Sequence, residues 1–235
     1  MASAAKSRRS GSRGEPEKTR AAILKAALEE FAHEGASGAR TDEIARRAGV
    51  NKALLYYYFK DKDGLYAAAL EQVFSGLHDQ VMAILNREDL APRAKLLQYV
   101  EAHFDYIAGR PFYPRLVQRE FMRSGARPLS PVANRILEHY ARPLYEQLEK
   151  LVREGIRTAD FRKVDPAETV SSILGTIVFY FISIPAQQVI RSGDAASADR
   201  IANRRAAVLD WVSAALFTAD AVPATEKGHR RERAQ

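Results

Sequence analysis

The chain has 235 residues, of which 46% are hydrophobic and 28% charged, and it contains no cysteine. This composition is typical of a folded globular protein with room for one large domain or for a small domain joined to a larger one. The lack of cysteine excludes disulfides, thiolate metal sites and cysteine nucleophiles. The longest apolar stretch, Ile173–Ile184, is interrupted by Gly175, Thr176 and Ser183, and no apolar core follows the basic N-terminus. We therefore expect a cytoplasmic protein without a membrane span.

The net charge of +7 is concentrated at the two ends of the chain. Residues 1–62 carry +5, residues 63–221 are balanced, and residues 222–235 add +2. Localised positive charge attracts nucleic acids, because phosphate neutralisation releases counterions. A basic tail can also serve solubility alone, so the charge favours a nucleic-acid partner without establishing one.

The N-terminal residues predict a basic arm followed by a helix. Residues 1–14 are dominated by Ser, Gly, Ala and basic residues, with no acid and no periodicity, which is typical of disorder. Residues 15–17, Glu-Pro-Glu, place acids and a proline at a helix start. Apolar residues at helical spacing, Leu24, Leu28 and Phe31, continue this helix until Gly35.

Two shorter helices are predicted next. Thr41 is the expected N-cap of the second helix, which buries Ile44. Gly49 can adopt the left-handed conformation of a sharp turn, and Asn51 can cap a third helix that ends at Phe59. This order of cap, turn and cap predicts a helix-turn-helix, whose second helix enters the major groove while the first holds it against the backbone.

The pattern of side chains within this motif supports that prediction. Ala45 supplies a small residue where the helices cross, and Leu55 and Phe59 face inward. The outward positions of the recognition helix are Lys52, Ala53, Tyr56 and Tyr57.

The rest of the chain predicts six further helices, about nine in all. They are separated near residues 88–92, 109–114, 125–131, 155–166 and 192–197. Residues 177–184 favour a strand by propensity, but Ile173, Ile177 and Phe181 keep helical spacing and no partner strand is found. We expect an all-α protein with a basic arm (1–14), a three-helix helix-turn-helix domain (15–62), a larger helical ligand-binding and dimerisation domain (63–220) and a basic flexible tail (221–235).

Three motifs carry a resemblance to a known family. They are Phe-Ala-x-x-Gly at residues 31–35, Ile-Ala-x-x-Ala-Gly-Val at 44–50 and Leu-Tyr-x-x-Phe-x-x-Lys-x-x-Leu at 55–65. This region, from about Thr19 to Leu70, resembles the DNA-binding domain of the TetR family of transcriptional regulators (TetR/AcrR type). The sequence departs from the family at Tyr58, where His is most frequent. The remainder matches in length and helix pattern.

The resemblance implies roles for individual residues. Contacts to DNA phosphates fall to Thr41, Tyr56, Tyr57 and Lys62, and contacts to bases to Lys52, Ala53 and Leu54. The chemistry agrees, since hydroxyls and lysine suit phosphate oxygens, and Lys52 can donate to guanine O6 and N7. As alternatives, the tyrosines are packing residues and Lys52 is a solvated charge. The arm, with Lys6, Arg8, Arg9 and Arg13, either enters a minor groove or is a free tail.

A regulator with one short recognition helix needs a second copy to read two half-sites about one helical turn apart. The resemblance implies that the last two helices of each subunit form a four-helix bundle in a homodimer. The candidate residues are Ile173, Ile177, Phe181, Ile184, Ile201, Val208, Trp211, Val212 and Leu216. The alternative is that these side chains form the core of one subunit.

The resemblance also implies that helices four to seven enclose a pocket for an unknown small-molecule effector. Candidate lining residues are His103, Phe104, Ile107, Phe112, Leu116, Arg119, Met122, Tyr140 and Leu144, with plain core as the alternative. Pro143 is expected to bend its helix and open space beside it. Arg115, Arg119 and Arg123 recur every four residues, which fits either an anionic ligand or a solvated basic stripe.

No catalytic motif is found. The sequence contains no nucleophile elbow, phosphate-binding glycine loop or His-Glu-x-x-His motif, and its five histidines do not pair at ligand spacing within a helix. We therefore expect no enzyme activity, no cofactor and no metal. The expected function is a ligand-responsive, sequence-specific repressor that binds double-stranded DNA at a palindromic operator. The alternatives are a nonspecific DNA-architectural protein and a ligand-binding enzyme domain.

Overall fold

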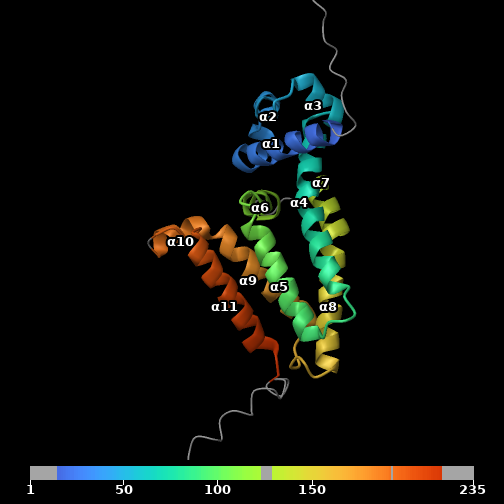
Figure 1. Ribbon diagram of the computed structural model, residues 1–235, viewed down its shortest axis with the longest axis vertical. Helices are drawn as coiled ribbons and strands as arrows, with labels where there is room; N and C mark the ends of the chain where they lie inside the picture. The colour runs from blue at the N-terminus through green and yellow to red at the C-terminus, as the bar shows by residue number, and fades with distance from the viewer. Residues whose placement is uncertain (1–14, 123–128, 192, 219–235) are drawn as a thin grey trace, which may run out of the picture. The chain divides into compact units, whose positions relative to one another are not determined.

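The computed structural model describes residues 15–122, 129–191 and 193–218, and this part of the chain is helical, as expected (Figure 1). The elements are α1 (Glu15–Gly38), α2 (Thr41–Ala48), α3 (Lys52–Phe59), α4 (Lys62–Leu85), α5 (Pro92–Ala108), α6 (Tyr113–Val117), the π-helical segment η1 (Gln118–Met122), α7 (Pro131–Ile136), the π-helical segment η2 (Leu137–Ala141), α8 (Arg142–Arg157), α9 (Pro166–Ile182), α10 (Ile184–Ile190) and α11 (Ala198–Leu216). The predicted arm and tail lie outside the described residues.

The chain forms two compact units. Of the described residues, the first contains 15–73, 115–122 and 129–132, and the second contains 74–114, 133–191 and 193–218. The helix α4 passes from the first unit into the second. The boundary that the sequence predicts at residue 62 stays a prediction.

In the first unit α1 packs against α2, and α2 against α3. Ile23 and Phe31 of α1, Ile44 of α2 and Leu55 of α3 are completely buried, which follows from their spacing along amphipathic helices. At Gly35 the backbone leaves the helical region with φ 75° and ψ 173°. The regular part of α1 therefore ends at Gly35, as its sequence predicts, and a last helical turn leads to Gly38.

In the second unit α5 packs against α8, α9 and α11. Each helix contributes fully buried apolar side chains to this core, among them Leu96, Phe104, Leu148, Ile177 and Val212. The β-bridge between Phe161 and Phe217 joins the chain after α8 to the end of α11, and the two rings stack with 5.5 Å between their centroids.

Two prolines interrupt the regular helices. Between the breaks at residues 155–166 and 192–197 the sequence predicts one helix, which is wrong, because α9 ends at Ile182 and α10 begins at Ile184 with a bend of 67°. Pro185 has no N–H, and in a continuous helix its ring would clash with the carbonyl of Phe181, so the helix breaks here. Counting α6 with η1 as one helix, and α7 with η2 and α8 as another, the described residues hold ten helices instead of nine. Next to Pro143 the helix widens into η2, which relieves a similar clash.

In the described ranges no single helix is long and apolar enough to cross a membrane, and the bent pair α9–α10 meets the criteria of length and composition only when its two helices are joined.

Candidate nucleic-acid interface

The turn between α2 and α3 has the geometry that its sequence predicts. Gly49 adopts the left-handed conformation, with φ 68° and ψ 29°, and ends α2. Asn51 has an extended backbone, and its Oδ1 accepts a hydrogen bond from the N–H of Leu54 at 2.7 Å. The asparagine thus satisfies one of the free donors at the start of α3, and both predictions are confirmed.

The start of α2 differs from the prediction. Arg40, not Thr41, is the N-cap residue, and its side chain makes no capping bond. The N–H of Arg40 donates to Oε1 of the buried Glu30 at 3.1 Å, which fixes the chain so that Thr41 is already helical. The hydroxyl of Thr41 instead lies 3.3 Å from that of Tyr56 on α3.

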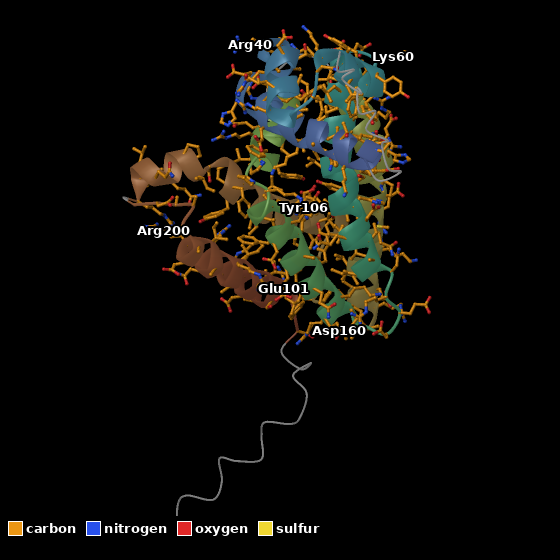
Figure 2. All side chains as sticks on the ribbon, turned by 45° about the horizontal axis from the view of Figure 1, so that its top comes forward. Arg40, Lys60, Glu101, Tyr106, Asp160 and Arg200 are labelled. Carbon is orange, nitrogen blue, oxygen red and sulfur yellow. The ribbon has the colours of Figure 1, made fainter. Side chains whose placement is uncertain are left out.

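The recognition helix α3 has one buried and one exposed side. Leu55 and Phe59 are buried, whereas Lys52 and Ala53 are exposed and Leu54 is half-buried. Tyr56 is 38% exposed and Tyr57 80%. Arg40 and Lys60, which are labelled in Figure 2, mark the two ends of the α2–turn–α3 segment.

Lysines around the motif have defined partners. Nζ of Lys52 lies 2.9 Å from Oδ1 of Asp42, and the hydrogen bond that Lys52 donates to Asp42 raises the pKa of Lys52. Lys62, at the start of α4, donates to the carbonyl of Ser37 at 2.9 Å. Hydrogen bonds therefore fix the positions of both ammonium groups on the first unit.

Glu43 is neutralised by two arginines of its own helix. Its carboxylate accepts hydrogen bonds from Arg46 at 2.6 Å and from Arg47 at 2.8 Å, and these bonds lower its pKa to about 2. The other acid of α2, Asp42, was missed in the sequence. An acid in the first turn of a helix is ordinarily explained by the helix dipole alone, and only its contact with Lys52 distinguishes it.

The predicted pocket residues fall in both units. In the second unit His103, Phe104, Ile107 and Leu144 are buried, while Tyr140 and Phe112 are half-buried, the latter in the turn before α6. In the first unit Leu116 is buried and Arg119 is half-buried. The side chain of Met122 and all of Arg123 lie outside the described residues.

The two described arginines of the predicted basic stripe contact α1. Arg119 donates to the carbonyl of His33, just before Gly35, and Nη1 of Arg115 lies 3.3 Å from Nδ1 of the same histidine. A pocket of about 810 Å³ lies elsewhere, in the second unit, between the end of α4, the start of α5 and α8. None of the predicted pocket residues lines it, and their role in ligand binding stays a prediction.

The predicted dimer residues are mostly internal. Six of the nine are buried within one subunit, namely Ile173, Ile177, Phe181, Val208, Val212 and Leu216. Ile184 and Ile201 are half-buried, and Trp211 is 47% exposed. Phe179 of α9, which is not among the predicted dimer residues, is 64% exposed. Its position, one turn after Gly175 and outside the buried stripe of α9, is the sequence feature that indicates an exposed side chain.

A capped recognition helix on a helix-turn-helix, joined to a larger helical unit, defines the class of helix-turn-helix transcriptional regulators. Two family models match the chain. The model of bacterial regulatory proteins of the tetR family covers residues 23–69, and that of the tetracyclin repressor-like C-terminal domain covers residues 92–212. The chain therefore belongs to the TetR family and is a transcriptional regulator, not an enzyme.

Relatives support this assignment. The HTH-type transcriptional repressor SCO4008 of Streptomyces coelicolor is 31% identical over 183 residues, which are 77% of this chain and 88% of the relative. A transcriptional regulator from Saccharomonospora viridis, solved in complex with choline, has a TM-score of 0.68 at 19% identity, with 86% of this chain and 99% of that chain covered. The regulator FadR from Bacillus subtilis, solved with stearoyl-CoA, has a TM-score of 0.62 at 20% identity, with 82% and 96% covered. The two structures share the fold.

Proposed function

We propose that the chain is a ligand-responsive, sequence-specific repressor that binds a palindromic operator as a homodimer and is released by a small molecule. The observation that carries the proposal is the exposed side of α3. Lys52, Ala53 and Tyr57 are exposed there, while Leu55 and Phe59 anchor the helix. As a regulator of DNA it would act in the cytoplasm.

The DNA contacts follow from the chemistry of this surface. Lys52 is placed at the start of α3, where a recognition helix meets base edges, and its ammonium suits guanine O6 and N7. The exposed methyl of Ala53, with Leu54 beside it, suits a thymine methyl. Contacts to phosphates are assigned to the hydroxyls of Tyr56 and Tyr57 on α3. Thr41 at the start of α2 and Lys62 at the start of α4 are assigned to phosphates as well.

A homodimer is proposed through α9 and α11, which contact each other within the second unit. Each of these helices exposes one large aromatic side chain, Phe179 and Trp211. Small residues accompany them, since Gly175 lies one turn before Phe179 and Ala207 and Ala214 flank Trp211. Aromatic side chains are enriched at protein–protein interfaces, and exposed ones on neighbouring helices therefore favour this surface.

Release by a small molecule is supported by the relatives, whose structures contain choline and stearoyl-CoA. In the second unit the buried His103 has one ring nitrogen, Nε2, without a hydrogen-bond partner among the described groups. Such an atom is a place for a polar group of an effector among aromatic neighbours. An effector works only if it binds the DNA-competent and DNA-incompetent states with different affinities.

The test is selection of bound duplexes from a random pool by the purified protein, followed by titration of the enriched sequence at several salt concentrations. A palindrome bound at least about 10³-fold more tightly than random DNA is the expected result. Lys52→Ala should relax the preference at one position, whereas Lys150→Ala, on α8, should leave binding unchanged. Salt-dependent binding without enrichment would indicate a nonspecific DNA-architectural protein.

Candidate effectors can then be screened by release of the labelled operator. Compounds that lower operator affinity by about 5- to 150-fold are expected, the range of ordinary allosteric coupling. If an anionic effector is found, Arg119→Ala tests whether the arginine contacts it, because loss of response with unchanged DNA binding would assign Arg119 to the ligand site.

A further inference from the structure

Asp42 and Lys52 form an ion pair across the turn of the helix-turn-helix. Nζ of Lys52 lies 2.9 Å from Oδ1 and 3.0 Å from Oδ2 of Asp42. Asp42 is the second residue of α2 and Lys52 the first of α3. The side chains are 76% and 46% exposed. A hydrogen-bond acceptor and a donor are thus held side by side, accessible from solvent, where the N-terminal ends of the two helices meet.

The hydroxyl contact between Thr41 and Tyr56 joins the start of α2 to the second turn of α3. Its oxygen atoms are 3.3 Å apart, and each residue lies within one turn of a member of the ion pair, Thr41 beside Asp42 and Tyr56 four residues after Lys52. Two contacts therefore fix the relative position of α2 and α3 on this side of the motif. The Asp42–Lys52 pair is consequently part of the recognition surface and not an isolated surface contact.

A carboxylate at this place weakens DNA binding unless a base uses it, because it repels the phosphates. The two acids of α2 differ in this respect. Glu43 is bonded to Arg46 and Arg47, so its charge is compensated within α2. Asp42 reaches instead to the first residue of the recognition helix.

The pair matches the chemistry of one base pair. In the major groove guanine presents two acceptors, N7 and O6, and its cytosine partner presents an N4 donor. Lysine donates to the guanine acceptors and aspartate accepts from cytosine N4. Thymine offers one acceptor, O4, with a methyl group next to it. A donor–acceptor pair of this kind therefore fits a G·C pair better than a T·A pair.

We infer that Asp42 is a further base-reading residue, which together with Lys52 reads one G·C pair in each half-site of the operator. Guanine faces the start of α3 and cytosine the start of α2. This inference rests on the proposed function, sequence-specific DNA binding. On DNA without the G·C pair, the carboxylate of Asp42 stays paired with the ammonium of Lys52 and lowers the affinity for DNA. The same residue therefore disfavours incorrect sequences.

The experiment uses the full-length protein and the duplex that it selects. Each base pair of both half-sites is replaced in turn, and dissociation constants are measured for the wild type, Asp42→Ala and Lys52→Ala. Asp63→Ala, which removes an exposed acid at the start of α4, is the control for charge alone. Circular dichroism of each variant checks folding.

The wild type should lose roughly 5- to 150-fold in affinity when the G·C pair at one symmetric position is replaced. Asp42→Ala and Lys52→Ala should lose most of this preference at that same position and keep it at the others. Asp63→Ala should keep it everywhere. Asp42→Asn offers both a donor and an acceptor, as adenine requires, so it should shift the preferred base from cytosine toward adenine.

Three results would overturn the inference while leaving the proposed function intact. They are an unchanged preference of Asp42→Ala at every position, effects of the Asp42 and Lys52 variants at different positions, and selection of T·A where both variants act. If the wild type enriches no sequence, the proposed function itself fails.

Discussion

The hydroxyl of Tyr99 lies 2.8 Å from Nδ1 of His103, one turn later on α5, and both side chains are buried. Burial lowers the pKa of His103 to about 4 and raises that of Tyr99. Both groups are therefore neutral near pH 7. The hydrogen bond between the tyrosine hydroxyl and Nδ1 lies in the interior of the second unit, where Nε2 has no partner among the described groups.

This pair predicts that acid destabilises the protein. Because the folded pKa of His103 is below its unfolded value of 6.5, the unfolded state binds the proton first. The free energy of unfolding should fall as the pH decreases from about 6.5 to 4, by up to about 3 kcal/mol from this residue. Denaturant titrations at several pH values measure the effect.

The matched variants are His103→Gln, which removes the titrating group, and His139→Gln, which changes an exposed histidine. His103→Gln should flatten the pH dependence in this range, and His139→Gln should leave it as in the wild type. An equal slope in wild type and His103→Gln would show that the buried imidazole does not control acid stability.

Two helical glycines should respond to alanine in opposite directions. A Cβ at Gly155 on α8 would lie 2.2 Å from the ring of the buried Phe161, whereas a Cβ at Gly175 on α9 would meet no atom within 4 Å. Gly155→Ala should destabilise by about 1–3 kcal/mol through overpacking. Gly175→Ala should stabilise its helix by about 0.5–1 kcal/mol.

Thermal unfolding of the two variants, compared at equal protein concentration, measures the difference. Because the proposed dimer includes α9, the comparison is made well below and well above the dimer dissociation constant. Destabilisation of Gly175→Ala at low concentration would contradict the open space found in the subunit.

The sequence predicted the local features of the first unit well, because each depends on few neighbouring residues. Gly49 and Asn51 adopt the turn and cap that their own side chains favour. The same reasoning predicts Thr41 as a cap, but the buried carboxylate of Glu30, ten residues before Arg40, fixes the chain at Arg40. A contact of this kind is not encoded in the spacing of α2.

Long-range relationships were less predictable. The apolar stripe on α9 indicated a buried face, but whether Ile177 faces its own core or a second subunit depends on the packing of α5, α9 and α11. The same limit applies to Asp42, whose partner Lys52 is ten residues away on another helix. Periodicity gives the face of a helix, and only the fold gives its neighbour.

The cap of the recognition helix should contribute to stability and to DNA binding. Asn51→Ala leaves the N–H of Leu54 without its 2.7 Å bond, which should cost about 1 kcal/mol in unfolding free energy. Operator affinity should fall as well, because α3 carries Lys52 and Tyr57. Asn51→Ser, which can also cap, should restore most of both. If alanine and serine behave alike, the capping bond is not what positions the helix.

The proposed dimer predicts a change of assembly on substitution of its exposed aromatic residues. Phe179→Glu and Trp211→Glu place a charge where the second copy should pack, at positions that are 64% and 47% exposed in one subunit. The subunit should therefore stay folded while the dimer dissociates, which analytical ultracentrifugation and circular dichroism measure together.

Since two linked half-site contacts bind roughly 10²–10⁴-fold better than one, operator affinity should fall by at least about 100-fold. Lys150→Glu is the control, because Lys150 is exposed but lies on α8, outside the proposed interface. Dimers of unchanged stability in both aromatic variants would place the interface on another surface.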